Sequence, residues 1–193
     1  MSERLHRAPG DVEGFAKVGE EIIYESWITF AKGTFRAPDG TEFARELVRH
    51  PGAVSVVPLM DDDDTVVLVR QYRPALGRFL MEIPAGKRDV AGEPVDETAQ
   101  RELGEETGMG AGRLDQLCHF HNSPGFSDES HFIFLARDLT EVPPAAQSIE
   151  EHHLTVERVS LSDLPQLIAG GIIADAKTML GLMLTQKWVE TGR

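Results

Sequence analysis

The sequence predicts an α/β protein, and three features of the chain support this fold class. Apolar, β-branched segments of strand length occur at residues 53–59, 65–71 and 131–136. Between the second and third of them lies one segment, residues 94–107, whose proline and glycine boundaries are typical of a helix. Residues 175–189 close the chain with the apolar spacing of an amphipathic helix. This order of strands and helices predicts helices packed on the faces of a sheet.

Length and composition limit the class of protein. With 193 residues the chain is long enough for one domain with a sizeable core and an N-terminal extension. The net charge of −13 argues against a nucleic-acid partner, because proteins that bind phosphate backbones carry a basic footprint. A single cysteine, Cys118, excludes an intrachain disulfide framework, and its apolar surroundings predict a buried, inert thiol. Because no export signal and no apolar run of about 18 residues is visible, we expect a soluble cytoplasmic protein without a membrane partner.

Residues 1–48 are predicted to form an N-terminal extension that precedes the main domain, residues 49–193. The extension consists of a polar leader expected to be partly disordered, a β-rich strand, a turn and a return strand, at residues 1–18, 22–30, 37–40 and 42–48. We call residues 21–48 the N-terminal hairpin.

The main domain is predicted to begin with two strands, residues 53–59 and 65–71, joined by a turn that contains four consecutive aspartates. This run lacks the ligand spacing of a calcium-binding loop, so a solvated hairpin turn is expected. Further strands are predicted at residues 79–83, 113–122, 131–136 and 154–161. His119 and His121 share one face of their strand, but no third ligand stands nearby in sequence, and we predict no zinc site there.

Two helices are predicted near the C-terminus. Ser162 is expected to cap a helix over residues 163–169, which Gly170 and Gly171 end. In the final helix, residues 175–189, four apolar side chains are expected to face the core: Met179, Leu182, Met183 and Trp188.

The segment with the strongest chemical signal is the helix predicted at residues 94–107. Pro94 suits the first helical turn, and Gly108 suits the left-handed position just past the end. Glu102, Glu105 and Glu106 have the spacing i, i+3 and i+4, which places three carboxylates on one face. Like charges at this spacing repel by roughly 0.2–0.5 kcal/mol per pair. A divalent cation that prefers oxygen ligands would turn this repulsion into coordination.

The surroundings of the three carboxylates distinguish them from an ordinary acidic surface helix. Arg101 has the i, i+4 spacing to both Glu97 and Glu105, so that it can orient and partly neutralise the acidic face. Ala99 and Leu103 line a different face, which is expected to be buried. A glycine-bearing loop stands immediately upstream of the helix.

This stretch resembles the Nudix box, G-x5-E-x7-R-E-U-x-E-E-x-G-U, in which U is a bulky apolar residue. Its fixed positions are filled by Gly86, Glu93, Arg101, Glu102, Leu103, Glu105, Glu106, Gly108 and Met109. One departure is visible, because six residues instead of five separate Gly86 from Glu93. The extra residue falls in the loop before the helix and leaves the acidic face unchanged.

The resemblance implies an α/β/α sandwich around a mixed β-sheet, with the N-terminal hairpin as an addition. It also implies hydrolysis within the pyrophosphate of a nucleoside diphosphate derivative, with Mg²⁺ as cofactor and Mn²⁺ as a substitute. By analogy with the family, the metal ligands would be the carbonyl of Ala85 together with Glu102, Glu105 and Glu106. Glu93 and Arg101 are assigned to structure, as an ion pair between the loop and the helix.

Strings outside the box resemble the ADP-ribose pyrophosphatase subfamily. They are residues 70–74 (RQYRP), 81–86 (MEIPAG) and 123–129 (SPGFSDE), with Glu150 and Glu151 in a later loop. The resemblance implies that ADP-ribose is cut to AMP and ribose 5-phosphate, with Glu150 as general base. Glu151 is the close alternative for this role, and Glu105 the alternative on the helix.

The same resemblance suggests substrate contacts and a homodimer. Seven residues are candidates for binding the substrate: Trp27, Arg45, Glu46, Arg73, Ser123, Gly125 and Glu129. Arg73 matches an arginine that contacts the diphosphate, and Trp27 is a candidate stacking platform for adenine. In the subfamily the N-terminal segment is exchanged between two subunits, so a homodimer through the N-terminal hairpin is expected.

Two other functions are compatible with the sequence. One is a Nudix module that binds ADP-ribose without cleaving it, and the other is a hydrolase of a different nucleoside diphosphate derivative. The complete glutamate set favours an enzyme over a binding module, because non-catalytic modules usually lose metal ligands.

Overall fold

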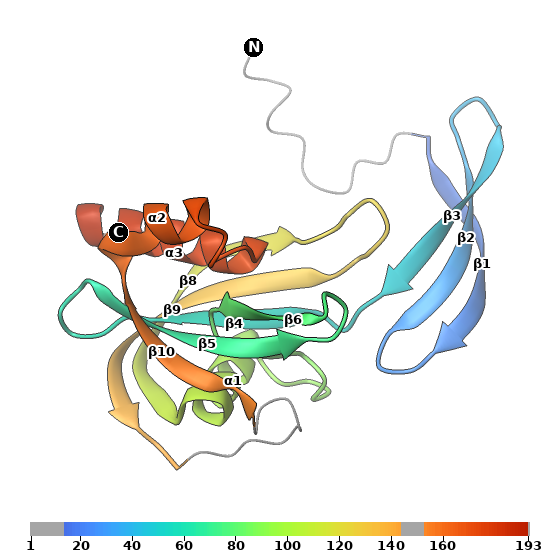
Figure 1. The fold of residues 1–193 in the computed structure, drawn as a ribbon. Coiled ribbons are helices and arrows are strands. Elements are labelled where there is room, and N and C mark those ends of the chain that lie inside the picture. Colours follow the sequence, from blue (N-terminus) through green and yellow to red (C-terminus); the bar gives the residue numbers. More distant parts are fainter. Residues whose placement is uncertain (1–13, 144–152, 193) are drawn as a thin grey trace. The chain divides into compact units, whose positions relative to one another are not determined.

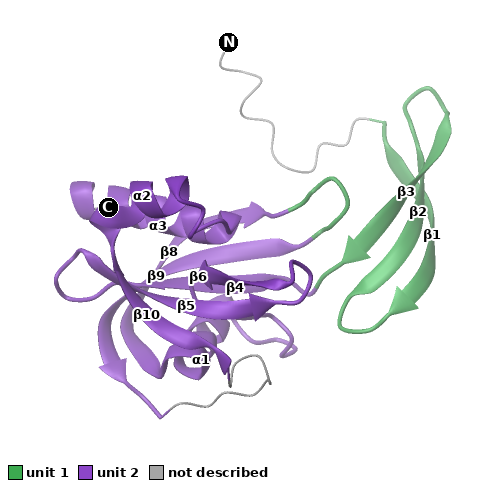
Figure 2. Cartoon of the chain, viewed as in Figure 1, with its two compact units in different colours: residues 1–50, 123–128 green, residues 51–122, 129–193 purple. Residues whose placement is uncertain are grey.

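The computed structural model describes residues 14–143 and 153–192. The chain divides into two compact units, which Figure 2 shows in different colours. The first unit consists of Met1–His50 together with Ser123–Asp128, and the second of Pro51–Asn122 together with Glu129–Arg193. No helix of the described ranges is long and apolar enough to cross a membrane.

The first unit contains an antiparallel sheet in the order β1-β2-β3, where β1 is Ala16–Glu25, β2 Thr29–Arg36 and β3 Glu42–Arg49 (Figure 1). Three strands thus replace the predicted two-stranded hairpin, because the expected strand at residues 22–30 is interrupted at Ser26, whose N–H donates to the carbonyl of Ile28 at 2.8 Å. The first strand also begins within the predicted polar leader. The turn at residues 37–40 is confirmed.

The segment Ser123–Asp128 is joined to the end of β3. The N–H of Val48 donates to the carbonyl of Phe126 at 2.8 Å, and Arg49 forms an ion pair with Asp128 at 3.0 Å. Arg49 also pairs with Glu20 of β1 at 2.6 Å. Arg49 therefore connects the loop with two strands of the N-terminal sheet.

The second unit contains two sheets. The first has the order β7-β4-β9-β8, in which β4 and β9 are parallel and the other pairs antiparallel; its strands are β4 Ala53–Pro58, β7 Ala85–Lys87, β8 Met109–His121 and β9 Ser130–Glu141. The second is antiparallel with the order β10-β5-β6, formed by β5 Thr65–Arg73, β6 Arg78–Glu82 and β10 Thr155–Ser160.

The expected hairpin between residues 53–59 and 65–71 is wrong in one respect. β4 and β5 belong to different sheets and share one isolated bridge, Leu59 with Val66. The turn between them is stabilised by Asp62, whose carboxylate accepts hydrogen bonds from the N–H and the hydroxyl of Thr65 at 2.7 and 2.6 Å. The aspartate run is therefore a turn, as predicted, and it connects the two sheets.

Helices cover both faces of the mixed sheet, which confirms the predicted sandwich (Figure 1). On one face, α1 (Val95–Thr107) buries Ala99 and Leu103 against Val54 and Val56 of β4. On the other face lie α2 (Leu164–Ala169), preceded by the 3₁₀ turn Leu161–Asp163, and α3 (Ala176–Thr191). Because successive side chains of β4 point to opposite faces of the sheet, this strand contributes to the hydrophobic cores on both faces.

Two details of the C-terminal helices differ from the predictions. The cap of the 3₁₀ turn is Ser160, whose hydroxyl accepts from the N–H of Ser162 at 3.1 Å, and not Ser162 itself. Met183 is 58% exposed, so its predicted place in the core is wrong. Met179, Leu182 and Trp188 do pack on the core, because they lie on the face of α3 that is turned to the sheet.

Candidate active site

The loop before α1 is fixed by strand pairing. In the short strand β7, Ala85 pairs with Ser55 and Gly86 with Val54, both in the buried strand β4. The helix then begins at Val95, with Pro94 as the residue just before it instead of in its first turn. Gly108 ends the helix with φ 67°, a conformation that glycine adopts without a side-chain penalty, as predicted.

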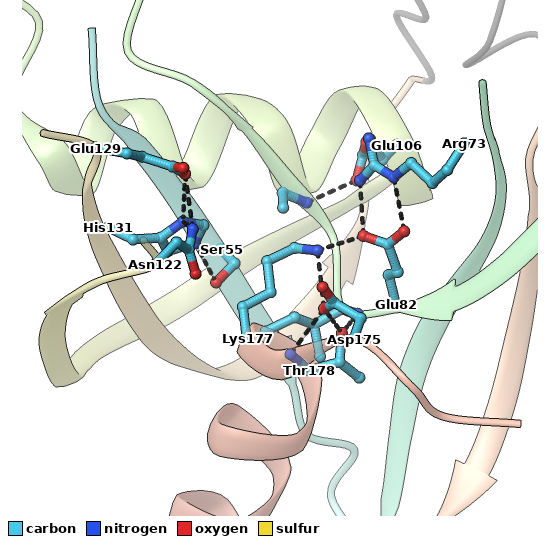
Figure 3. Close-up of polar contacts among 12 residues, drawn as sticks. Ser55, Arg73, Glu82, Glu106, Asn122, Glu129, His131, Asp175, Lys177 and Thr178 are labelled. Carbon is cyan, nitrogen blue, oxygen red and sulfur yellow. Dashed lines mark hydrogen bonds and ion pairs between the residues drawn. The ribbon is translucent and has the colours of Figure 1, made fainter. Parts of the chain in front are cut away.

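Glu102 and Glu106 of α1 approach this loop. The carboxylate of Glu106, a residue only 6% exposed, accepts a hydrogen bond from the N–H of Ala85 at 2.8 Å (Figure 3). A Cβ atom placed on Gly86 would stand 1.8 Å from Cδ of Glu102. The glycine is therefore required, because any side chain at residue 86 would displace the Glu102 carboxylate.

Arg101 is the cation that organises the acidic face. Its Nε and Nη2 atoms donate to the two oxygens of Glu93 at 3.2 Å each, and its Nη1 atom donates to Glu102 at 2.9 Å and to Glu105 at 3.0 Å. The predicted ion pair between loop and helix is therefore present. The hydrogen bond from Arg101 lowers the pKa of Glu93.

Glu102 carries a perturbed carboxyl group. Burial raises its pKa to about 7, although the charge of Arg101 works in the opposite direction. In the described part of the chain, no three acidic, histidine or cysteine side chains form a ready-made metal cluster. The carboxylates of α1 nevertheless suit a divalent cation, because Mg²⁺ prefers oxygen ligands. A metal ion in addition to Arg101 would also favour the ionised form of the buried Glu102 carboxyl group.

Arg73, predicted to contact the diphosphate, ends β5 next to this acidic face. Its Nε and Nη2 atoms donate to the two oxygens of Glu82 at 2.7 Å each, a bidentate ion pair (Figure 3). This hydrogen bond raises the pKa of Arg73 against the opposing effect of burial, and the charge of Glu106 adds to it. The guanidinium therefore lies within electrostatic reach of a predicted metal ligand.

A network that the sequence did not reveal holds Glu82 from the other side. Lys177 of α3 donates to Glu82 and, at 2.9 Å, to Asp175, the N-cap of the same helix. Thr178 donates through its N–H and hydroxyl to Asp175 at 2.9 and 2.6 Å, and accepts from the N–H of Ile83 at 3.0 Å. The sequence contains one indication of this network, because the charged residue Glu82 stands between the apolar residues Met81 and Ile83.

Glu129, another predicted substrate contact, takes part in a second network of the same unit. Its carboxylate accepts from the side-chain amide of Asn122 at 2.8 Å and lies 3.4 Å from Nδ1 of His131 (Figure 3). Nε2 of His131 is in turn 3.0 Å from Oγ of Ser55. The order Ser-His-Glu resembles a nucleophilic triad, but Ser55 is 0% and His131 2% exposed. No substrate can reach this hydroxyl, so the network instead joins β4 and β9 to the loop residues Asn122 and Glu129 that lie between β8 and β9.

The other predicted substrate contacts lie in the first unit. Trp27 is 59% exposed in the bend between β1 and β2, with its ring 5.6 Å from that of His50. The guanidinium of Arg45 lies 4.8 Å from the ring centre of Phe43, and Glu46 is exposed on β3 opposite Lys32. Ser123 and Gly125 belong to the loop Ser123–Asp128. The carbonyl of Ser123 accepts hydrogen bonds from the N–H groups of Phe126 and Ser127, which forms a turn. A Cβ atom placed on Gly125 would have no other atom within 4 Å.

The structure therefore brings part of the predicted site together. Glu102, Glu105, Glu106, Ala85 and Arg73 all belong to the second unit, whereas the contacts predicted on the hairpin and in the Ser123 loop belong to the first. Glu150 and Glu151 lie outside the described residues. Cys118 is half-buried instead of fully buried, and burial raises the pKa of its thiol, which agrees with an inert role.

The comparisons with known proteins agree with this geometry. The NUDIX domain model matches residues 49–179. An ADP-ribose pyrophosphatase of Bacillus subtilis is 39% identical over 149 residues, which are 77% of this chain and 80% of that protein. An ADP-ribose pyrophosphatase of Mycobacterium tuberculosis is 36% identical and covers 92% of this chain and 86% of its own length.

Among solved structures, an ADP compounds hydrolase superposes with a TM-score of 0.81 at 25% identity, covering 92% of this chain and 95% of its own. Nudix hydrolases generally need divalent metal ions. The chain belongs to the Nudix family of hydrolases.

Proposed function

We propose that this protein hydrolyses the pyrophosphate bond of ADP-ribose, or of a closely related ADP-sugar, to AMP and ribose 5-phosphate, with Mg²⁺ as the cofactor and Mn²⁺ as a substitute. The observation that carries the proposal is the acidic face of α1 against the loop at Ala85, with Arg73 in electrostatic reach of Glu106. The named activities of the relatives in Bacillus subtilis and Mycobacterium tuberculosis support the choice of ADP-ribose.

The roles of the residues follow from their chemistry. Glu102, Glu105 and Glu106, with the carbonyl of Ala85, would hold the metal, which when bound screens the diphosphate and acidifies water. Arg101 keeps Glu102 and Glu105 in place and limits their mutual repulsion. Arg73 offers a planar cation to the phosphate oxygens, an arrangement suited to bidentate recognition.

The general base is assigned from sequence alone. Glu150 is the first candidate, Glu151 the neighbouring alternative and Glu105 the alternative on α1. Removing a general base costs about 10²–10⁴-fold in rate, so Glu150→Gln is expected to lower kcat by this factor with little change in KM. Wild-type kcat in both Glu150→Gln and Glu151→Gln would exclude these two residues.

The oligomeric state forms part of the proposal. On β1 and the bend that follows, Ile22, Ile23, Tyr24 and Trp27 are each more than half exposed, and β1 is an edge strand. Covering these side chains would remove apolar surface from water, which favours association, and we propose a second copy of the chain as the partner that covers them. The N-terminal sheet and the loop Ser123–Asp128 would then supply Trp27, Arg45, Glu46, Ser123 and Gly125 to the substrate. Glu129, which follows this loop, would contribute to substrate binding by fixing the position of the loop. We also propose that the protein is cytoplasmic.

A panel of nucleoside diphosphate derivatives tests the substrate. We expect kcat/KM with Mg²⁺ to be highest for ADP-ribose, with other bases and non-nucleotide diphosphates at least about tenfold lower. A clear preference for another derivative would contradict the proposed substrate but not the hydrolase. Tight binding of ADP-ribose without turnover would instead identify the non-catalytic binding module.

A further inference from the structure

We infer that Glu82 is a positioning residue, which holds the Arg73 guanidinium in the one orientation that presents its remaining N–H groups to the substrate diphosphate. The inference rests on the proposed function. It concerns a residue outside the Nudix box, in the strand before the loop. Its basis is the geometry of the bidentate pair and of the network behind it.

The pair uses a defined edge of the guanidinium. Glu82 accepts from Nε and Nη2 of Arg73, both at 2.7 Å, so the Nη1 group points away from the carboxylate. The Arg73 side chain is 37% exposed, whereas that of Glu82 is 1% exposed. The cation thus has one edge bound to a buried anion, which leaves Nη1 free of this pair, and the negative charge of Glu106 also acts on the guanidinium.

Glu82 itself cannot rotate freely. It ends β6, where it pairs with Val69 of β5, and the same carboxylate accepts from Lys177 of α3 (Figure 3). Asp175 neutralises Lys177 at 2.9 Å. The two cations and two anions balance in charge, and they join the strand pair that carries Arg73 to the N-terminus of α3.

Stability alone does not explain this arrangement. A buried ion pair gains little over apolar residues of the same volume, because desolvation offsets the attraction between the charges. A flexible arginine, in contrast, loses side-chain entropy when it binds an anion, and a preformed orientation removes this cost. Glu82 therefore acts on the substrate through Arg73 and makes no contact of its own.

A double-mutant cycle tests the inference with Glu82→Gln, Arg73→Gln and the double variant, all assayed with ADP-ribose and Mg²⁺. Each single variant is expected to lower kcat/KM by about 10–100-fold through KM, with kcat nearly unchanged, because the lost contact binds ground and transition state equally. The double variant should be no worse than Arg73→Gln alone. Multiplied effects in the double variant, or a wild-type KM in Glu82→Gln, would overturn the inference.

Leu182→Ala is the control for a merely structural role. Leu182 lies on α3, is 1% exposed, and packs in the core through an apolar side chain that makes no hydrogen bond. This variant should lower the melting temperature and leave KM within about twofold of wild type. If Leu182→Ala raised KM as much as Glu82→Gln does, general loosening would explain both effects and the inference would fail.

Two further arms keep the result unambiguous. If Glu82→Gln does not fold, Glu82→Asp retains the charge with a shorter reach and should still raise KM; a wild-type KM would contradict the inference. If the wild-type enzyme does not hydrolyse ADP-ribose, the proposed substrate fails first. The cycle is then run on the best substrate of the panel, whose diphosphate Arg73 would contact in the same way.

Discussion

The backbone N–H of Ala85 donates a hydrogen bond of 2.8 Å to the carboxylate of Glu106. The two residues stand 21 positions apart, one in a strand of the sheet and the other in the last turn of α1. Both were predicted to hold the metal ion. The bond holds the loop against the helix and thereby positions the two predicted ligands relative to each other.

The first prediction concerns Glu106→Gln. The amide oxygen of glutamine can still accept from Ala85, so the fold should persist, but one ligand charge is lost. Because metal-assisted charge stabilisation contributes several kcal/mol, we expect kcat to fall by about 10²–10³-fold. Steady-state kinetics at saturating Mg²⁺ measure the effect. Glu97→Gln, an equal charge change on the exposed side of α1, should keep the wild-type rate. A Glu106→Gln enzyme with wild-type kcat would show that Glu106 is not a ligand.

The second prediction concerns the contact between Gly86 and Glu102. A methyl group at residue 86 would overlap the Glu102 carboxylate, so Gly86→Ala should displace the loop or the side chain. We expect weaker Mg²⁺ binding by calorimetry and a loss of activity. The matched control is Gly104→Ala on α1, where the nearest atoms are 3.6 Å away and alanine favours the helix by about 1 kcal/mol. Equal Mg²⁺ affinity in both variants would refute the steric argument.

Features of the fold that neighbouring residues determine were predicted correctly, whereas features that depend on distant partners were not. The helix predicted at residues 94–107 and its end at Gly108 follow from the spacing of residues within one short segment, and the ion pair of Arg101 with Glu93 from the resemblance of that segment to the Nudix box. The network of Glu82 could not be predicted in the same way, since its partner Lys177 stands 95 positions away. Nothing in the local sequence of Glu82 indicates which cation it meets.

The pairing of the strands could not be predicted for the same reason. The apolar patterns of residues 53–59 and 65–71 identify two strands, but pairing is decided by partners elsewhere in the chain, β9 for β4 and β10 for β5. The break at residues 26–28 lacks the glycine and proline that usually indicate a turn. Met183 has the right spacing for the core but lies on the exposed side of α3.

The third prediction concerns the acid stability of the Glu82 network. Burial raises the pKa of Glu82, but the hydrogen bond from Arg73 and the charge of Lys177 outweigh burial and hold this pKa below its ordinary value of 4.5. The folded state therefore binds this proton more weakly than the unfolded state. The resulting stabilisation is complete above pH 4.5 and is lost as the pH falls through the folded pKa.

Urea unfolding between about pH 3 and about pH 7 measures this effect. The wild-type free energy of unfolding should fall in the acid range, and Glu82→Gln should be less stable at neutral pH but lose less on acidification. Curves that run parallel for the two proteins would show that Glu82 does not titrate in this way.

The fourth prediction concerns assembly. Ile22→Glu places a charge on the exposed apolar part of β1 and should convert the proposed dimer into a monomer, as measured by sedimentation velocity. Met183→Glu is the control, because Met183 is as exposed as Ile22 but lies on α3 in the other unit; it should remain dimeric. A wild-type protein that is monomeric at assay concentration, or a dimeric Ile22→Glu variant, would contradict the proposed interface.

The most direct test of the central claim is to follow the products from ADP-ribose in ¹⁸O-labelled water with Mg²⁺. Attack within the pyrophosphate should yield AMP and ribose 5-phosphate, one of which carries the label, and chelation of the metal should abolish the reaction. ADP together with free ribose, or cleavage that persists at the same rate in excess chelator, would contradict the account.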